Sequence, residues 1–99
     1  MYRGTTPTLK FTLPFEASTL AEAYISVEQN RRVILEKSIE DCTLSGKTIS
    51  VKLTQEETLK LGVSDRTEIQ LRVRLADGSA LASQIFAVST ERILKDGVI

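Results

Sequence analysis

The sequence contains no histidine and no tryptophan, and its only cysteine is Cys42. The common zinc sites and the Ser-His-Asp and Cys-His catalytic arrangements therefore cannot be built within one chain. A single cysteine also excludes an internal disulfide, and with it the disulfide-rich scaffolds of small secreted proteins. Cys42 follows Glu40 and Asp41, whose charges oppose a reactive thiolate, so we expect a buried or half-buried thiol without a chemical role.

Neither sign of charge is in excess, because 13 Lys and Arg residues balance 13 Asp and Glu residues. Without a net field the chain has no general attraction for nucleic acid or for anionic membranes, so we expect neither as a partner. Near neutrality also weakens the repulsion between copies, which favours a homo-oligomer.

Long apolar runs are absent as well. No 18 apolar residues occur together, and the first ten residues, MYRGTTPTLK, lack the apolar segment of a signal peptide. We therefore expect no membrane segment and synthesis in a reducing cytoplasm. With 99 residues, 41% of them hydrophobic, the chain is expected to form a single domain over residues 1–99.

Alternating apolar and polar residues predict the first strand near residues 8–13. Leu9, Phe11 and Leu13 would face the core, while Thr8, Lys10 and Thr12 would face outward. Pro14 withdraws a backbone donor, so the strand ends there or lies at a sheet edge from that point on. Further β-rich runs lie at residues 23–29 and 32–39, expected as a hairpin around Asn30 and Arg31, and at 48–53, 67–75 and 80–90.

The turn at Asp77 and Gly78 allows two registers for the strand that follows it. A two-residue turn would bury Ala80, Ala82 and Gln84, whereas a three-residue loop with Gly78 left-handed would bury Leu81 and Ile85. We favour the three-residue loop, because Gln84 is the worse core residue.

One helix is predicted, near residues 55–61 in the stretch LTQEETLKLG. Thr54 and Glu57 have the spacing of a capping box, and Gly62 is expected as a left-handed C-terminal cap. Adjacent helical residues point about 100° apart, so Glu56 and Glu57 cannot face each other as a catalytic pair. The segment is interpreted as a structural corner.

Together these elements indicate an all-β fold: an antiparallel, immunoglobulin-like β-sandwich of six or seven strands with one short helix. The four aspartates fall in expected turns, with no calcium-loop spacing and no Gly-rich phosphate loop nearby. We therefore expect no catalytic residues, no cofactor, no metal and no enzymatic activity. Four residues remain candidates for a small contact patch, namely Tyr2, Tyr24, Arg31 and Arg32.

Four segments carry a resemblance to known sequences: YRGTTPTLKFTLPF, VKLTQEETLKL, IQLRVRLADGSALAS and ILKDGVI. Together they resemble a family of short uncharacterised proteins encoded in prophages of Gram-positive gut bacteria, over nearly the whole chain. The order of elements is also similar to the immunoglobulin-like N-terminal domain of phage baseplate upper proteins. The sequence departs from that pattern by ending at Ile99 without an appended receptor-binding domain.

The resemblance implies a non-enzymatic structural or adaptor protein of a phage tail or baseplate, acting through protein–protein contacts. Such a protein would be made in the cytoplasm of the bacterial host and enter the virion on assembly. The expected interaction edges are the first strand, at Thr8, Lys10 and Thr12, and the C-terminal tail, at Ile93, Leu94, Val98 and Ile99. The alternative is a small ligand-binding module for cell-surface glycan, using the contact patch.

Overall fold

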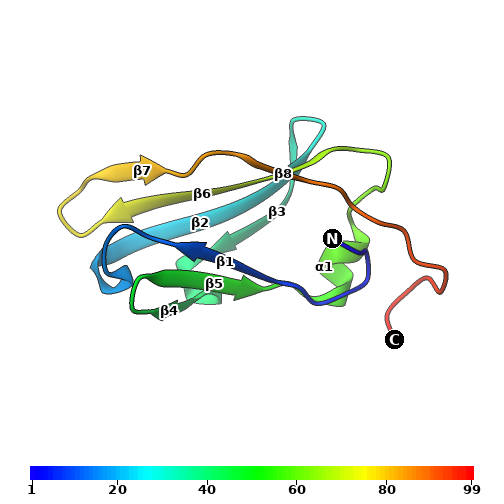
Figure 1. Ribbon diagram of the computed structural model, residues 1–99, viewed down its shortest axis with the longest axis horizontal. Coiled ribbons are helices and arrows are strands. Elements are labelled where there is room, and N and C mark those ends of the chain that lie inside the picture. Colours follow the sequence, from blue (N-terminus) through cyan, green and yellow to red (C-terminus); the bar gives the residue numbers. More distant parts are fainter.

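Two antiparallel sheets packed face to face make up the computed structural model, which describes residues 1–99 (Figure 1). The three-stranded sheet has the order β1-β5-β4, with β1 at Thr8–Thr12, β5 at Thr48–Lys52 and β4 at Thr43–Ser45. In the second sheet the order is β3-β2-β6-β7, and β8 also pairs with β6. Its strands are β3 (Arg32–Ser38), β2 (Leu20–Gln29), β6 (Thr67–Leu75), β7 (Ala80–Ala82) and β8 (Phe86–Val88). This confirms the expected all-β sandwich.

Three short helices complete the chain: α1 at Gln55–Leu59, and two 3₁₀ turns at Ala17–Thr19 and Ile39–Asp41. The structure has eight strands, one more than the upper expectation. The three-residue β4 has no buried side chain and therefore no alternation from which to predict it. In addition, the segment expected as one strand at residues 80–90 is divided into β7 and β8.

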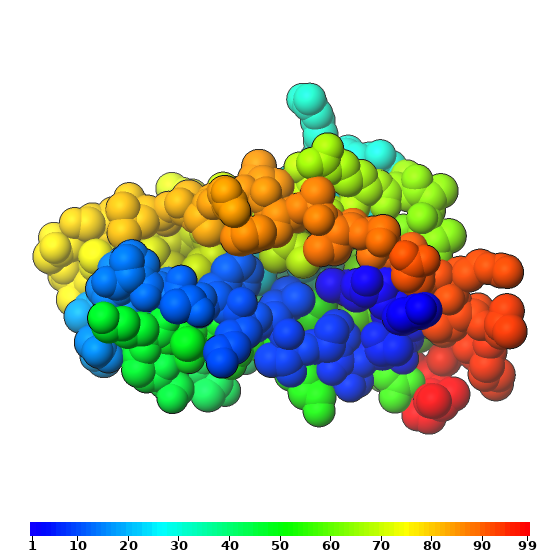
Figure 2. All heavy atoms as spheres, in the orientation of Figure 1, coloured from blue at the N-terminus to red at the C-terminus, as the bar shows by residue number.

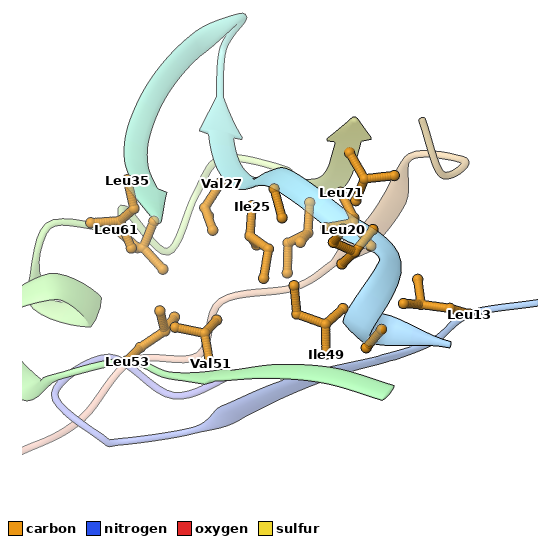
Figure 3. Close-up of a cluster of buried hydrophobic side chains, with 14 residues drawn as sticks. Leu13, Leu20, Ile25, Val27, Leu35, Ile49, Val51, Leu53, Leu61 and Leu71 are labelled. Carbon is orange, nitrogen blue, oxygen red and sulfur yellow. The ribbon is translucent and has the colours of Figure 1, made fainter. Parts of the chain in front are cut away.

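The core lies between the sheets, where alternate side chains of each sheet meet (Figure 3). Ile25, Val27 and Leu71 point from the larger sheet toward Ile49 and Val51 of the smaller one. Burying one such side chain contributes roughly 1.5–3 kcal/mol. The alternation that predicted β6 is confirmed, because Ile69, Leu71 and Val73 are all buried.

The hairpin between β2 and β3 turns at Asn30 and Arg31, as expected. Both residues have positive φ, 53° and 60°, which is the backbone of a two-residue turn that follows the sheet twist. Val27 pairs with Leu35 but Glu28 pairs with Val33, so Ile34 is an extra residue in the ladder. This β-bulge explains why β3 does not alternate cleanly in sequence.

The three-residue loop before β7 is confirmed. The Leu75 amide donates to the Ser79 carbonyl at 2.8 Å, and Gly78 has a φ of +93°. Leu81 consequently lies opposite the buried Val73, on the inner face, but its expected burial is wrong because its side chain is 46% exposed. The expected burial of Ile85 is wrong: its side chain is 56% exposed, because the register slips by one residue between β7 and β8 and brings Phe86 opposite Ile69.

The corner at α1 has the expected capping box. The Glu57 amide donates to Thr54 Oγ1 at 3.2 Å, and the Thr54 amide donates to Glu57 Oε1 at 2.8 Å. The other carboxylate oxygen of Glu57 forms an ion pair with Lys37 of β3. Partial burial raises the pKa of Glu57, but the hydrogen bond from Lys37 and those from Thr54 together lower it below its usual value. Glu57 is therefore a structural carboxylate that joins α1 to β3.

The expected left-handed cap at Gly62 is wrong, because its φ is not positive. Side chains from other elements complete the helix end instead. Arg3 donates to the carbonyls of Leu59 and Leu61, both at 2.8 Å, and the Gly62 amide donates to Gln29 Oε1 at 2.9 Å. With these carbonyls and this amide already satisfied, the chain needs no left-handed residue here.

The ion pair gives a testable difference between two adjacent glutamates. We expect Glu57→Gln to lower the free energy of unfolding at pH 7 by about 1 to 2 kcal/mol, since it leaves the partly buried Lys37 ammonium unpaired. Glu56→Gln, at an exposed residue, is the matched control and should change it by less than about 0.5 kcal/mol.

The same pair predicts a pH dependence. A lowered pKa in the folded state stabilises the protein above the unfolded-state pKa of about 4.3, and this contribution disappears as the pH falls through the folded-state pKa. The difference in the free energy of unfolding between wild type and Glu57→Gln, measured by urea titration, should therefore be smaller at pH 3 than at pH 7. An equal loss of unfolding free energy in Glu57→Gln and Glu56→Gln at pH 7 would contradict a stabilising ion pair between Glu57 and Lys37.

Candidate functional site

The sandwich is open along one side, between β1 of the smaller sheet and β7 and β8 of the larger one. Figure 1 looks toward this side, and Figure 2 shows the blue residues of β1 beside the yellow to orange residues of β7 and β8. A groove of about 610 Å³ lies here, and ten of its fifteen lining residues are hydrophobic. We call it the edge groove; its walls include Leu9 and Phe11 from β1, Leu81 from β7 and Phe86 from β8.

The opening arises from unequal sheets. Three strands lie on one side, but four strand positions lie on the other, with β7 and β8 sharing the last position beside β6. Leu81 and Phe86 face inward, opposite Val73 and Ile69, yet their side chains are 46% and 40% exposed because no strand covers them. The rings of Phe11 and Phe86, with centroids 6.0 Å apart, make one contact across the groove.

One edge of β1 has free backbone groups. The Leu13 amide donates to the Lys47 carbonyl at 2.7 Å, and the Leu53 amide donates to the Pro7 carbonyl at 2.9 Å. In an antiparallel pair every second residue bonds to the same neighbour, so odd-numbered residues of β1 bond to β5. The N–H and C=O groups of Thr8, Lys10 and Thr12 therefore point away from β5, along the edge of the sheet.

The charge around the edge groove has one sign. Lys10 is the only charged residue among those that line it. On the outer face of the small sheet, Lys10 lies opposite Ser50, and Thr8 lies opposite Lys52. Strands β1, β4 and β5 contain no carboxylate at all. The edge is therefore weakly basic and rich in hydroxyl groups.

Ser83 shapes the opposite wall of the groove. Its hydroxyl accepts from the Leu71 amide at 3.0 Å, while its carbonyl accepts from Gln70 Nε2 at 3.0 Å. The hydroxyl thus replaces a ladder bond where the strand bulges between β7 and β8. Sequence reasoning placed Leu81 on the inner face but did not indicate that Leu81, Ser83 and Phe86 line a groove. The only available signal was the polar pair Ser83-Gln84, which interrupts an apolar run.

The structure places Thr8, Lys10 and Thr12 on an edge strand, as expected, and their part in recognition stays a prediction. The expectation of a second edge in the C-terminal tail is wrong, since no strand follows Val88. Glu91 forms only an isolated bridge to Tyr2. The tail residues Ile93, Leu94, Val98 and Ile99 present no sheet edge.

Local chemistry explains why the tail is not a strand. The sequence Lys95-Asp96-Gly97 interrupts the apolar residues, and Gly97 has a φ of +83°. The segment instead lies near α1, where the Ile99 amide donates to Gln55 Oε1 at 2.8 Å (Figure 1). Leu94 is left 91% exposed.

The expected contact patch is not assembled. Tyr2, Tyr24, Arg31 and Arg32 are all exposed, but they lie in different places. Tyr24 pairs with Ser38 at the far end of the β2–β3 ladder from Arg31 and Arg32, about 16 Å away at the usual rise of a strand. Tyr2 is bridged to the C-terminal segment. Glu22, as a hydrogen-bond acceptor and as a negative charge, raises the pKa of Tyr24.

Metal-ligating side chains do not cluster anywhere in the structure. No group of three or more His, Cys, Asp or Glu residues could hold a metal ion. Cys42 is half-buried, as expected, and its thiol donates to the Ser38 carbonyl at 3.3 Å. Burial, and then the charge of Asp41, raise the pKa of this thiol. The longest helix, α1, has five residues, so none of the helices could span a membrane.

The free edge predicts an alternating pattern of hydrogen exchange along β1. In dilute solution the amides of Thr8, Lys10 and Thr12 should exchange at least tenfold faster than those of Leu9, Phe11 and Leu13, because only the odd-numbered amides have partners in β5. Exchange followed by NMR provides the measurement, with the odd-numbered residues as internal controls. Protection of Lys10 and Thr12 equal to that of their neighbours would contradict a free edge.

Comparison with known proteins adds no assignment to this site. The chain matches no protein-family model, no curated protein and no solved structure.

Proposed function

We propose that this protein is a non-enzymatic structural or adaptor protein of a phage tail or baseplate, acting through protein–protein contacts. The observation that carries the proposal is the open side of the sandwich, where an apolar groove lies beside a strand with free backbone groups. Sheet edges of this kind bind other chains by continuing the hydrogen-bond ladder.

The chemistry of the groove suits a protein partner better than a small substrate. Its only charged lining residue is Lys10, and no carboxylate, thiol or metal-ligating cluster lies within it. A catalytic pocket needs several converging polar groups, whereas the polar lining of the edge groove consists of Lys10 and the hydroxyl-bearing Thr8, Thr12 and Ser83, without a carboxylate beside them.

The assignment to a phage particle is supported by the resemblance of YRGTTPTLKFTLPF, VKLTQEETLKL, IQLRVRLADGSALAS and ILKDGVI to prophage proteins. The first of these segments contains β1, and the third contains the β6–β7 hairpin, so two of the four border the edge groove. On this proposal the chain is made in the bacterial cytoplasm and is incorporated into the virion. The glycan-binding alternative depended on the contact patch, whose residues lie apart, and we do not carry it forward.

A particle-composition experiment tests the proposal. We expect the protein to co-purify with tail proteins, at fixed stoichiometry, when particles from an induced lysogen are banded on a density gradient and analysed by mass spectrometry. Deleting its gene should lower the titre of infectious particles by at least tenfold, and a copy supplied in trans should restore it. Absence from the banded particles together with an unchanged titre would refute the proposal.

A further inference from the structure

The edge groove has the shape of a missing strand. The small sheet ends at β1, while the larger sheet continues past it to β7 and β8. One additional strand beside β1 would lie over Leu81 and Phe86, whose inward-facing side chains are 46% and 40% exposed although the Phe86 ring contacts Phe11. It would also complete four strand positions in each sheet.

The backbone of β1 is prepared for such a strand. Thr8, Lys10 and Thr12 each direct an N–H and a C=O group along the free edge. A neighbouring strand in the same sheet would bond to these groups, and every second side chain would enter the groove. Residues opposite Leu9 and Phe11 would need to be apolar, whereas residues opposite Lys10 would face solvent.

Charge selects the outward side chains of that strand. Directly opposed residues on neighbouring strands interact, and opposite charges are favoured. Because Lys10 and Lys52 lie on this face with no carboxylate from β1, β4 or β5, an acidic residue opposite Lys10 is favoured there.

A second copy of the chain fits the edge less well. Two copies of β1 related by a two-fold axis would pair antiparallel, and their fullest overlap places Lys10 opposite the same lysine of the partner, which is destabilising. Shifting the register by two residues shortens the overlap of this five-residue strand to three. In one direction the shift also brings in Pro14, which has no N–H to donate.

We therefore propose that the edge groove binds one extended segment of a partner protein as a fourth strand beside β1. The segment alternates apolar residues facing the groove with polar residues facing solvent, and it carries an acidic residue opposite Lys10. This inference rests on the proposed function, because it specifies the chemistry of the protein partner.

A designed peptide provides a probe without knowledge of the natural partner. The peptide TVTVEVTVT, fluorescently labelled, places valines toward the groove and its glutamate opposite Lys10. The peptide TVTVKVTVT reverses the charge, and VVTTETTVV keeps the composition but destroys the alternation. By fluorescence anisotropy we expect TVTVEVTVT to bind at least fivefold more tightly than TVTVKVTVT and at least tenfold more tightly than VVTTETTVV.

Two pairs of variants locate the binding site. Lys10→Glu should reverse the preference between the two alternating peptides, whereas Lys60→Glu, on an exposed residue at the end of α1, should leave it unchanged. Thr12→Pro should weaken binding of TVTVEVTVT more than tenfold, because it removes an outward N–H. That N–H does not bond to β5, so the sheet itself is retained. Thr12→Val keeps the N–H and should bind within about twofold of wild type.

The outcomes separate this inference from the proposed function. Equal binding of VVTTETTVV and TVTVEVTVT, or equal binding by Thr12→Pro and Thr12→Val with both variants folded by circular dichroism, would overturn it. Reversible dimerisation of the wild type that Thr12→Pro abolishes would assign the groove to a second copy and overturn it as well. Peptide binding by a protein that is absent from virions would refute only the phage role, while normal incorporation of Thr12→Pro into virions would refute only the groove.

Discussion

The inequality between the two sheets is the constraint on which the rest of this structure depends. Three strands can cover only part of a sheet that is four strands wide. The residues in the middle of the sandwich, such as Ile25 and Ile49, are completely buried. Burial decreases toward the open side, where β1 is the last strand of the smaller sheet. The same alternation that builds the core therefore also leaves Leu81 and Phe86 exposed. The groove is the margin of the core that no strand covers. Strand register directs its residues inward, but they remain partly exposed.

The end of the sandwich near the β2–β3 turn and α1 is closed by polar contacts. Gln29 is buried, and its amide donates to the Gly62 carbonyl and to Thr67 Oγ1, while its carbonyl oxygen accepts from the Gly62 amide. No buried side-chain polar atom of the structure lacks a hydrogen-bond partner. A buried amide costs free energy unless it is bonded, so this end is held in one arrangement. Arg3 adds a link from the N-terminal segment to the end of α1.

Much of the fold could be predicted from local patterns, and the failures share one physical cause. The alternation of β6, the turn at Asn30 and Arg31, and the capping box at Thr54 are all set by residues close in sequence. The cap at Gly62 failed because Arg3 and Gln29, distant in sequence, satisfy the groups around it. The expected burial of Ile85 failed because a bulge changes register inside an apolar run. Only one wall of the edge groove could be predicted from the sequence. β1 shows a strand pattern next to a proline, whereas the opposite wall can be recognised only when it is known which strands face each other.

The four edges of the two sheets differ in the features that hinder pairing with another chain. These features are weakest at one edge, which is therefore the best suited to accept a further strand. Edge strands usually carry bulges, charges or prolines, or are very short. β4 has only three residues, β3 is bulged at Ile34, and the β7–β8 margin is interrupted at Ser83. β1 alone keeps five residues in regular register, with a single lysine as its charge and Pro14 just beyond its end. Lys10 repels the same lysine of a second copy but attracts a strand with an acidic residue at that position. The charge of β1 therefore disfavours pairing between two copies of this edge without preventing pairing with a different chain.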